Sequence, residues 1–105
     1  MVHYIALYKL RADVSDEQLE NMIRATRSQL LKIPEVLHIA SGQKINRDSE
    51  WPFFVSVDFE SLDKMAMCQD DPIYIKFKEE VIRPYTRDAL ELQYETEPGK
   101  DTKYS

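Results

Sequence analysis

Histidine and tyrosine side chains have the chemistry for proton transfer or for orienting a ligand, and the chain has two histidines and six tyrosines, among them His3 and Tyr74. An imidazole titrates near neutral pH and acts as a general acid or base, whereas a phenol with a pKa of about 10 is better suited to donating a proton or orienting a carbonyl oxygen. Each also has a structural interpretation. His3 is a core histidine satisfied by a backbone carbonyl or a water, and Tyr74 is an amphipathic side chain with its hydroxyl in water at a helix start. The sequence leaves these alternatives open.

Four further residues carry weaker signals. Cys68 is the only cysteine, so no intrachain disulfide forms, and a lone cysteine is more simply a packing residue than a nucleophile. His38 and Glu35 are both metal-ligand types, but two ligands do not make a metal site. Trp51 either gates a cleft or packs at the start of a strand, and packing is the simpler interpretation.

The element that holds His3 is a run from Val2 to Leu10, apolar at both odd and even positions, which predicts a strand buried on both faces. A helix follows, because Ser15 and Gln18 form a capping box. Pro34 ends this helix, since a residue before proline is pushed out of the helical region.

Two more strands are predicted next. The second covers Val36 to Ile45, with Gly42 expected at a bulge or bend. The third covers Phe53 to Glu60, and its strict alternation places Phe54 on the face opposite to Phe53.

The helix that holds Tyr74 begins at Asp71, an N-cap residue, with Pro72 in the first turn. A shorter helix, capped by Ser61, precedes it and runs to about Gln69. Pro84 closes the second helix, and a last strand is predicted over residues 87–95.

The predicted order is β-α-β-β-α-β with the second helix broken in two, which is the ferredoxin-like arrangement. The fold class is therefore α+β, a four-stranded antiparallel sheet with helices on one face. The other face still carries apolar side chains such as Phe54, so we expect a second copy of the chain to cover it in a homodimer.

Composition narrows the possible partners. The chain has 105 residues and a net charge of -5 without a basic cluster, which argues against nucleic acid. No run reaches the roughly 18 apolar residues of a membrane span, and no basic segment precedes the first apolar run, so we expect a cytoplasmic protein. Residues 1–96 are predicted to form one domain and residues 97–105 a flexible C-terminal tail.

Five short motifs lie in order on these elements: residues 3–10 (HYIALYKL), 33–36 (IPEV), 57–61 (VDFES), 71–72 (DP) and 81–84 (VIRP). Together they resemble the stress-responsive A/B barrel (Dabb) family of dimeric α+β barrels. The resemblance implies that two subunits place their sheets face to face, leaving a cleft between each sheet and its own helices. Plant members include polyketide cyclases.

The resemblance also implies site residues. A histidine at the start of the first strand lines the cleft in those enzymes, and His3 matches it. The family's His-Pro-x-His motif reads Asp-Pro-Ile-Tyr at residues 71–74, so Tyr74 stands where the catalytic imidazole would be. Cys68 stands at the position of the assisting tyrosine, and Phe53 at that of a third-strand histidine. The cyclase mechanism is therefore not expected to carry over.

Some family members hold Mg²⁺ through backbone carbonyls where the first helix ends. By resemblance the corresponding carbonyls belong to Leu30, Ile33 and Val36. Helix C-terminal carbonyls are chemically suitable ligands, but they leave no side-chain signature. We expect no side-chain metal site and no cofactor.

The expected function is a homodimer that binds a small apolar or aromatic molecule between sheet and helices, with cofactor-free polyketide-cyclase-like or lyase/isomerase chemistry. His3 and Tyr74 are the catalytic candidates. The expected ligand-binding residues are His3, Ile5, Leu7, Val55, Val57, Tyr74 and Phe77. The alternatives are a non-enzymatic stress-response or assembly protein and a cofactor-independent monooxygenase of the related barrel group.

Overall fold

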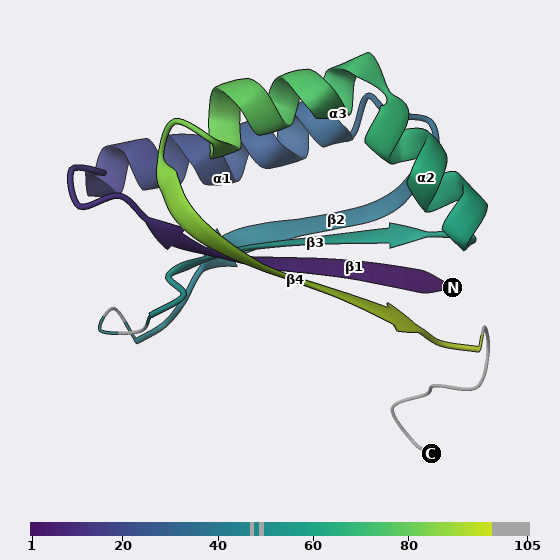
Figure 1. Cartoon of the computed structure of the whole chain (residues 1–105), viewed down its shortest axis with the longest axis horizontal. Coiled ribbons are helices and arrows are strands. Elements are labelled where there is room, and N and C mark those ends of the chain that lie inside the picture. Colours follow the sequence, from purple (N-terminus) through teal and green to yellow (C-terminus); the bar gives the residue numbers. More distant parts are fainter. Residues whose placement is uncertain (47, 49, 98–105) are drawn as a thin grey trace.

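Among the residues that the structure describes, four strands and a layer of helices make up the fold (Figure 1). The computed structural model describes residues 1–46, 48 and 50–97. The elements are β1 (Val2–Leu10), α1 (Asp16–Leu30), β2 (Val36–Gln43), β3 (Phe53–Phe59), α2 (Leu62–Asp70), α3 (Pro72–Phe77), the π-helix η1 (Lys78–Ile82) and β4 (Thr86–Glu95). The predicted ferredoxin-like order is confirmed.

The sheet has the strand order β2-β3-β1-β4, and every neighbouring pair is antiparallel. β1 is therefore central, and the last strand is an edge. All the helices lie on one side of the sheet, as Figure 1 shows, and among the described residues no helix covers the other side. We call the uncovered side the open face and the other the helix-facing side.

The helix starts agree with the capping signals in the sequence. Ser15 Oγ accepts the backbone N–H of Gln18 at 3.1 Å, and the Gln18 side chain accepts the N–H of Ser15 at 2.9 Å. Asp71 caps α3 by accepting the N–H of Ile73 at 2.8 Å. These hydrogen bonds pair backbone N–H groups of the first helical turn, which have no partner within the helix itself.

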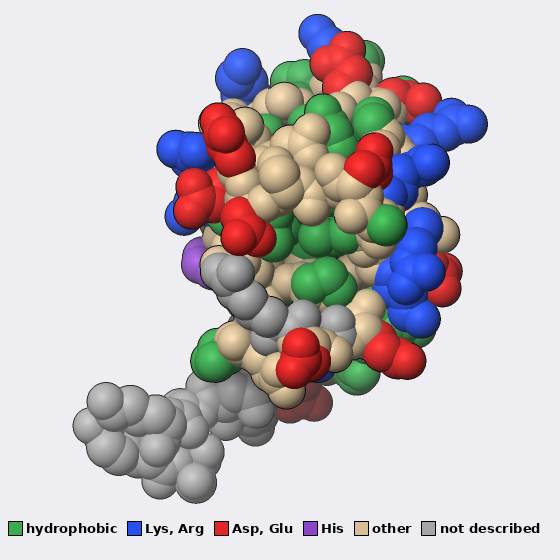
Figure 2. All heavy atoms as spheres, turned by 90° about the vertical axis from the view of Figure 1, so that its left-hand side faces the viewer, with side chains coloured by type: hydrophobic (Ala, Val, Ile, Leu, Met, Phe, Trp, Pro, Cys, Tyr) green, Lys and Arg blue, Asp and Glu red, His purple; other side chains and the backbone are tan. Residues whose placement is uncertain are grey.

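The core lies between the sheet and the helices, because alternate residues of β1 and β3 point toward the helices. Figure 2 shows hydrophobic side chains between the helical layer and the sheet, with charged side chains around them. The buried strand residues are Val2, Tyr4, Ala6, Tyr8, Phe53, Val55, Val57 and Phe59.

Two local features differ from expectation. The predicted irregularity at Gly42 is wrong, since Gly42 pairs regularly with Phe54 and the register shift of β2 lies between Val36 and His38. Gly42 instead lies close to an aromatic ring: a Cβ atom there would be 3.1 Å from Phe54 Cε1, so the ring would have to shift by a few tenths of an ångström to admit a larger residue. In addition, α3 widens into η1 before Pro84, where the Arg83 N–H bonds to the Lys78 carbonyl at 2.9 Å.

The predicted tail, residues 97–105, lies outside the described residues from residue 98 onward, so its flexibility stays a prediction. Within the part of the chain that the structure describes, no helix is long and apolar enough to cross a membrane.

Candidate functional site

The seven predicted ligand-binding residues do not line one cleft. Val55 and Val57 are buried on the helix-facing side, where Phe77 and Tyr74 also pack. The β1 residues His3, Ile5 and Leu7 point to the open face, because they alternate with the buried residues of the strand. The expected grouping is wrong in this respect, and ligand binding by either group stays a prediction.

A polar cluster lies on the helix-facing side, near Tyr74. Its members are Tyr4 and Tyr8 of β1, Tyr74 of α3, Lys78 of η1 and Glu91 of β4. Glu91 Oε1 accepts from Tyr4 Oη at 2.7 Å and from Lys78 Nζ at 3.2 Å. Lys78 Nζ also lies 3.4 Å from Tyr8 Oη and 6.0 Å from the centre of the Tyr74 ring. We call these five residues the tyrosine–lysine cluster.

The surroundings of the cluster fix its protonation. Burial raises the pKa of Tyr4, Tyr8 and Tyr74. Burial alone would lower the pKa of Lys78, but its tyrosine and glutamate neighbours outweigh burial and raise it. The hydrogen bond from Tyr4, with the ammonium of Lys78, lowers the pKa of Glu91 more than burial raises it. At neutral pH the phenols are neutral, the lysine is charged and the glutamate is ionised.

This protonation pattern determines what the cluster can do. Neutral phenols and an ammonium group donate hydrogen bonds, so they suit a carbonyl, phenolate or carboxylate oxygen of a ligand. Glu91 is the one ionised acceptor of the cluster, and its lowered pKa makes it a weak base. The cluster therefore favours binding and polarising an oxygen over abstracting a proton.

His3 belongs to a separate network on the open face. Its Nδ1 lies 2.6 Å from Asp58 Oδ1 and its Nε2 lies 2.8 Å from Thr96 Oγ1. His38 Nδ1 lies 3.7 Å from Asp58 Oδ2. His3 is thus partnered by side chains, and it does not share a face with Tyr74.

The rest of the open face is largely apolar. Ile5 pairs with Leu92, and Leu7 pairs with Leu90 and Phe54. A hollow of about 220 Å³, lined by Leu7, Lys44, Trp51 and Phe54, lies on it. Lys9 Nζ lies 4.9 Å above the ring of Trp51, so this tryptophan packs on the sheet surface.

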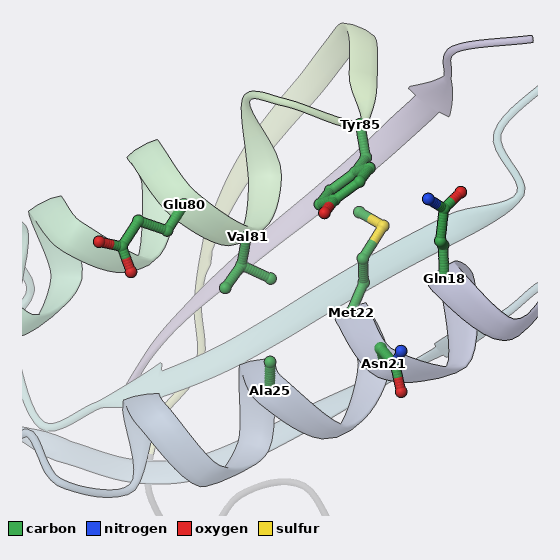
Figure 3. A pocket seen from close by; sticks show the side chains of 7 residues that line it. All are labelled: Gln18, Asn21, Met22, Ala25, Glu80, Val81 and Tyr85. Atoms are coloured by element: carbon green, nitrogen blue, oxygen red, sulfur yellow. The ribbon is translucent and has the colours of Figure 1, made fainter. Parts of the chain in front are cut away.

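The helical layer contains a further cavity of about 170 Å³ between α1 and η1 (Figure 3). Met22 points toward the Tyr85 ring there, and Val81 completes an apolar floor. The remaining lining residues are Gln18, Asn21, Ala25 and Glu80. No member of the tyrosine–lysine cluster lines this cavity, so the two locations are separate candidates.

A family model decides the classification of the chain. The model of the stress-responsive A/B barrel domain matches residues 2–96. The chain belongs to this family. No curated protein sequence matches it.

Solved structures of other proteins share this fold. A dimeric ferredoxin-like protein of unknown function from Thermobifida fusca is 26% identical, with a TM-score of 0.79 over 89% of this chain and 88% of that one. The hydroxynitrile lyase from Passiflora edulis is 22% identical, with a TM-score of 0.75 over 92% and 96%. A cofactor-independent oxygenase from Streptomyces nogalater is 9% identical, with a TM-score of 0.71 over 91% and 92%. Because the lyase and the oxygenase differ in activity, the shared fold assigns neither activity to this chain.

Cys68 of this A/B barrel protein has the environment of a packing residue. It is 1% exposed, and burial raises the pKa of its thiol to about 12, with the charges of Asp71 and Glu35 adding to the effect. A thiol in this environment holds very little of the reactive thiolate at neutral pH.

We therefore expect native Cys68 to react with dithiobis(nitrobenzoate) at pH 8 at least about 100-fold more slowly than in urea, because a free cysteine has a pKa of about 8.5. The chain has one cysteine, so the absorbance change reports this thiol alone. Equal rates in the native and unfolded protein would contradict the burial.

The backbone carbonyls expected to suit Mg²⁺ are partly engaged. The Leu30 carbonyl accepts the N–H of Ile33 at 3.1 Å, and the Ile33 carbonyl accepts the N–H of Val36 at 3.2 Å. Among the described residues no group of three or more His, Cys, Asp or Glu side chains could hold a metal ion. Each of these carbonyl oxygens keeps a second lone pair, so Mg²⁺ binding by the backbone at this position stays a prediction.

The sequence pattern did not reveal four members of the cluster: Tyr4, Tyr8, Lys78 and Glu91. In β1 both faces are apolar, so alternation does not show which face meets the helices. Glu91 comes from the last strand, and only the antiparallel register of β4 with β1 places it opposite Ala6. The available signal was the pair of tyrosines, whose phenols need hydrogen-bond partners when buried.

Proposed function

We propose that the protein is a cytoplasmic homodimer that binds a small aromatic or apolar molecule, carrying a carbonyl or anionic oxygen, at the tyrosine–lysine cluster. The observation that carries this proposal is the convergence of Lys78 and three phenols on one spot of an otherwise apolar interior. A few converging polar groups among apolar walls are typical of ligand sites.

In the free protein the hydrogen-bond donors of the cluster bind a carboxylate of the protein itself, and a ligand oxygen would replace that carboxylate. Glu91 Oε1 accepts hydrogen bonds from both Tyr4 and Lys78, and its side chain is 48% exposed at the edge of the sheet. A ligand oxygen that takes these two donors would leave Glu91 in water, where an ionised carboxylate is well solvated. Entry along the exposed edge strand β4 is consistent with this exchange.

Turnover at the cluster would rely on protein side chains alone, as in lyase or isomerase chemistry. Donors on a carbonyl oxygen stabilise the negative charge that develops there. Tyr74 would donate a hydrogen bond to the ligand oxygen through its neutral phenol. His3 would take no part, because it lies on the other side of the sheet.

The homodimer is supported by the open face. Its apolar residues include Leu90, which is 40% exposed, and Tyr94, which is 55% exposed. Exposed large apolar side chains gathered on one face support an interaction site there. The similar protein from Thermobifida fusca is described as dimeric.

A second candidate function is that of a non-enzymatic assembly protein. Tyr4 and Tyr8 are 4% and 2% exposed, so they fill the interior beneath α3 and η1. In this function the dimer itself is the functional unit. The hydrogen bonds of the tyrosine–lysine cluster then serve only to hold β4 against the helices.

Binding of 2-naphthoate, measured by saturation-transfer NMR and titration, tests the first candidate. We expect Lys78→Met to weaken 2-naphthoate binding by about 10–100-fold, because a hydrogen bond to a charged group contributes about 1.5–3 kcal/mol. Tyr74→Phe should weaken it less. The neutral 2-naphthylmethanol should bind native protein more weakly than the anion.

Two matched variants locate the binding. His3→Gln lies on the open face and should leave 2-naphthoate affinity unchanged. Ala25→Trp fills the cavity between α1 and η1, and it should also have no effect. Loss of binding in Ala25→Trp with retention in Lys78→Met would move the site to that cavity, and the absence of any binding to native protein would favour the assembly function.

A further inference from the structure

Three adjacent strands bring two imidazoles to one carboxylate on the open face. His3 of β1 and His38 of β2 both stand opposite Asp58 of β3 in the antiparallel register. The histidine nitrogens lie 2.6 and 3.7 Å from the two carboxylate oxygens. We call His3, His38 and Asp58 the histidine–carboxylate network.

The other polar groups around this network are few. From β4, Tyr94 pairs with His3, and the Thr96 hydroxyl lies 2.8 Å from His3 Nε2. The N-terminal ammonium of Met1 donates to the Thr96 carbonyl at 2.7 Å. Glu60 is exposed beyond the end of β3. Among the described residues no helix packs on this face, so the strands supply the surroundings of the network.

The charge of the network depends on one proton. With both imidazoles neutral, Asp58 gives the network a charge of minus one; with one imidazole protonated, the charge is zero. In the free chain water reaches it, because the His3 and Asp58 side chains are 26% and 19% exposed and that of His38 is 69% exposed. Burying the network with its charge of minus one costs much more free energy than burying it, still hydrogen-bonded, with a net charge of zero.

We propose that dimerisation through the open face takes up protons at the histidine–carboxylate network, so that the homodimer is tighter at pH 6 than at pH 8. This rests on the homodimer of the proposed function and adds its control by pH. The partner is a second copy of the chain, whose own network is covered in the same event because a two-fold interface uses the same surface twice.

The sign follows from proton linkage. The dimer holds more protons than two free chains, so lowering the pH favours the dimer and raising the pH weakens it. Over a pH range in which dimerisation takes up one full proton, the dissociation constant changes tenfold per pH unit. With two networks per dimer and partial uptake, we expect the constant to fall at least about tenfold from pH 8 to pH 6.

Sedimentation equilibrium of the full chain at pH 6, 7 and 8, at constant ionic strength, tests this. The matched variants are Asp58→Asn and the double variant His3→Gln/His38→Gln, which removes both histidines of the chain. The double variant should lose the pH dependence. In Asp58→Asn the sign should reverse, because protonation then creates a covered positive charge. Circular dichroism establishes that each variant is folded.

The outcomes separate the two proposals. A monomer at every pH would overturn the homodimer itself. A native dimer whose dissociation constant is the same at pH 6 and pH 8 would leave the homodimer standing and overturn the proton uptake. A native pH dependence retained in both variants would place its source elsewhere and also overturn it. For a dimer too tight to dissociate, the concentration dependence of the urea unfolding midpoint supplies the same constants.

Discussion

Replacing Leu92 by glutamate should convert the proposed homodimer into a folded monomer. Leu92 lies on the open face of β4 opposite Ile5, and it is half-buried in the single chain. A carboxylate at position 92 is hydrated in the monomer but is buried in the dimer. Each dimer buries two such carboxylates, one from each chain. At about 2 kcal/mol for each covered and unpaired polar group, the dissociation constant should rise about 1000-fold. Sedimentation equilibrium measures this rise.

The neighbouring position supplies a control for Leu92. Gln93 is exposed on the helix-facing side of the same strand, opposite Tyr4. Gln93→Glu introduces the same charge at almost the same place in the sequence and should leave the dissociation constant nearly unchanged. If Leu92→Glu remained a dimer of native affinity, the open face would not be the interface.

Replacing Phe53 by alanine should lower the free energy of unfolding by about 3–5 kcal/mol. Phe53 is completely buried, and its ring stacks on that of Tyr8 with a centroid distance of 5.6 Å. The substitution removes these contacts and leaves a cavity in the core. Because domains of this size have a total stability of about 5–15 kcal/mol, Phe53→Ala should be close to unfolding. Urea denaturation in the monomeric Leu92→Glu background measures the loss without a contribution from dimerisation.

Phe54 is the matched control, since it has the same side chain one position along the same strand. It is half-buried on the open face of the single chain. Phe54→Ala in the same monomeric background should cost clearly less than Phe53→Ala. Equal losses would contradict the assignment of the two faces of β3.

The sequence predicted the fold well because the local signals agree with one another. The capping box at Ser15, the N-cap at Asp71 and the alternation from Phe53 to Phe59 each define an element without help from distant residues. The widening into η1 was not predicted, because a single extra residue in a helical turn has no distinct sequence signal. The bulge or bend expected at Gly42 is absent there. Glycine is favoured both at a bulge and at a close approach to an aromatic ring, and the sequence does not distinguish the two.

The site was predicted less well, for a physical reason. Tyr74 was a candidate through the family resemblance of residues 71–74, and its position at the helix start is fixed locally by Asp71 and Pro72. The face of His3 depends instead on the register of β1, and a change of one residue moves every side chain of a strand to the opposite face. The partners Lys78 and Glu91 come from different elements and meet only in the folded chain.

The central position of β1 also governs when the fold can be completed during synthesis. β1 emerges from the ribosome first among the strands, yet one of its two neighbours is β4, and hydrogen bonds at the end of this pair join residues 95 positions apart. Until β4 is made, one edge of β1 has no strand to pair with, and such an edge is prone to pair with other chains. The sheet therefore closes late, in a topology whose long-range contacts are slow to form, and nascent chains of this protein are most exposed to misassembly just before residues 86–95 appear.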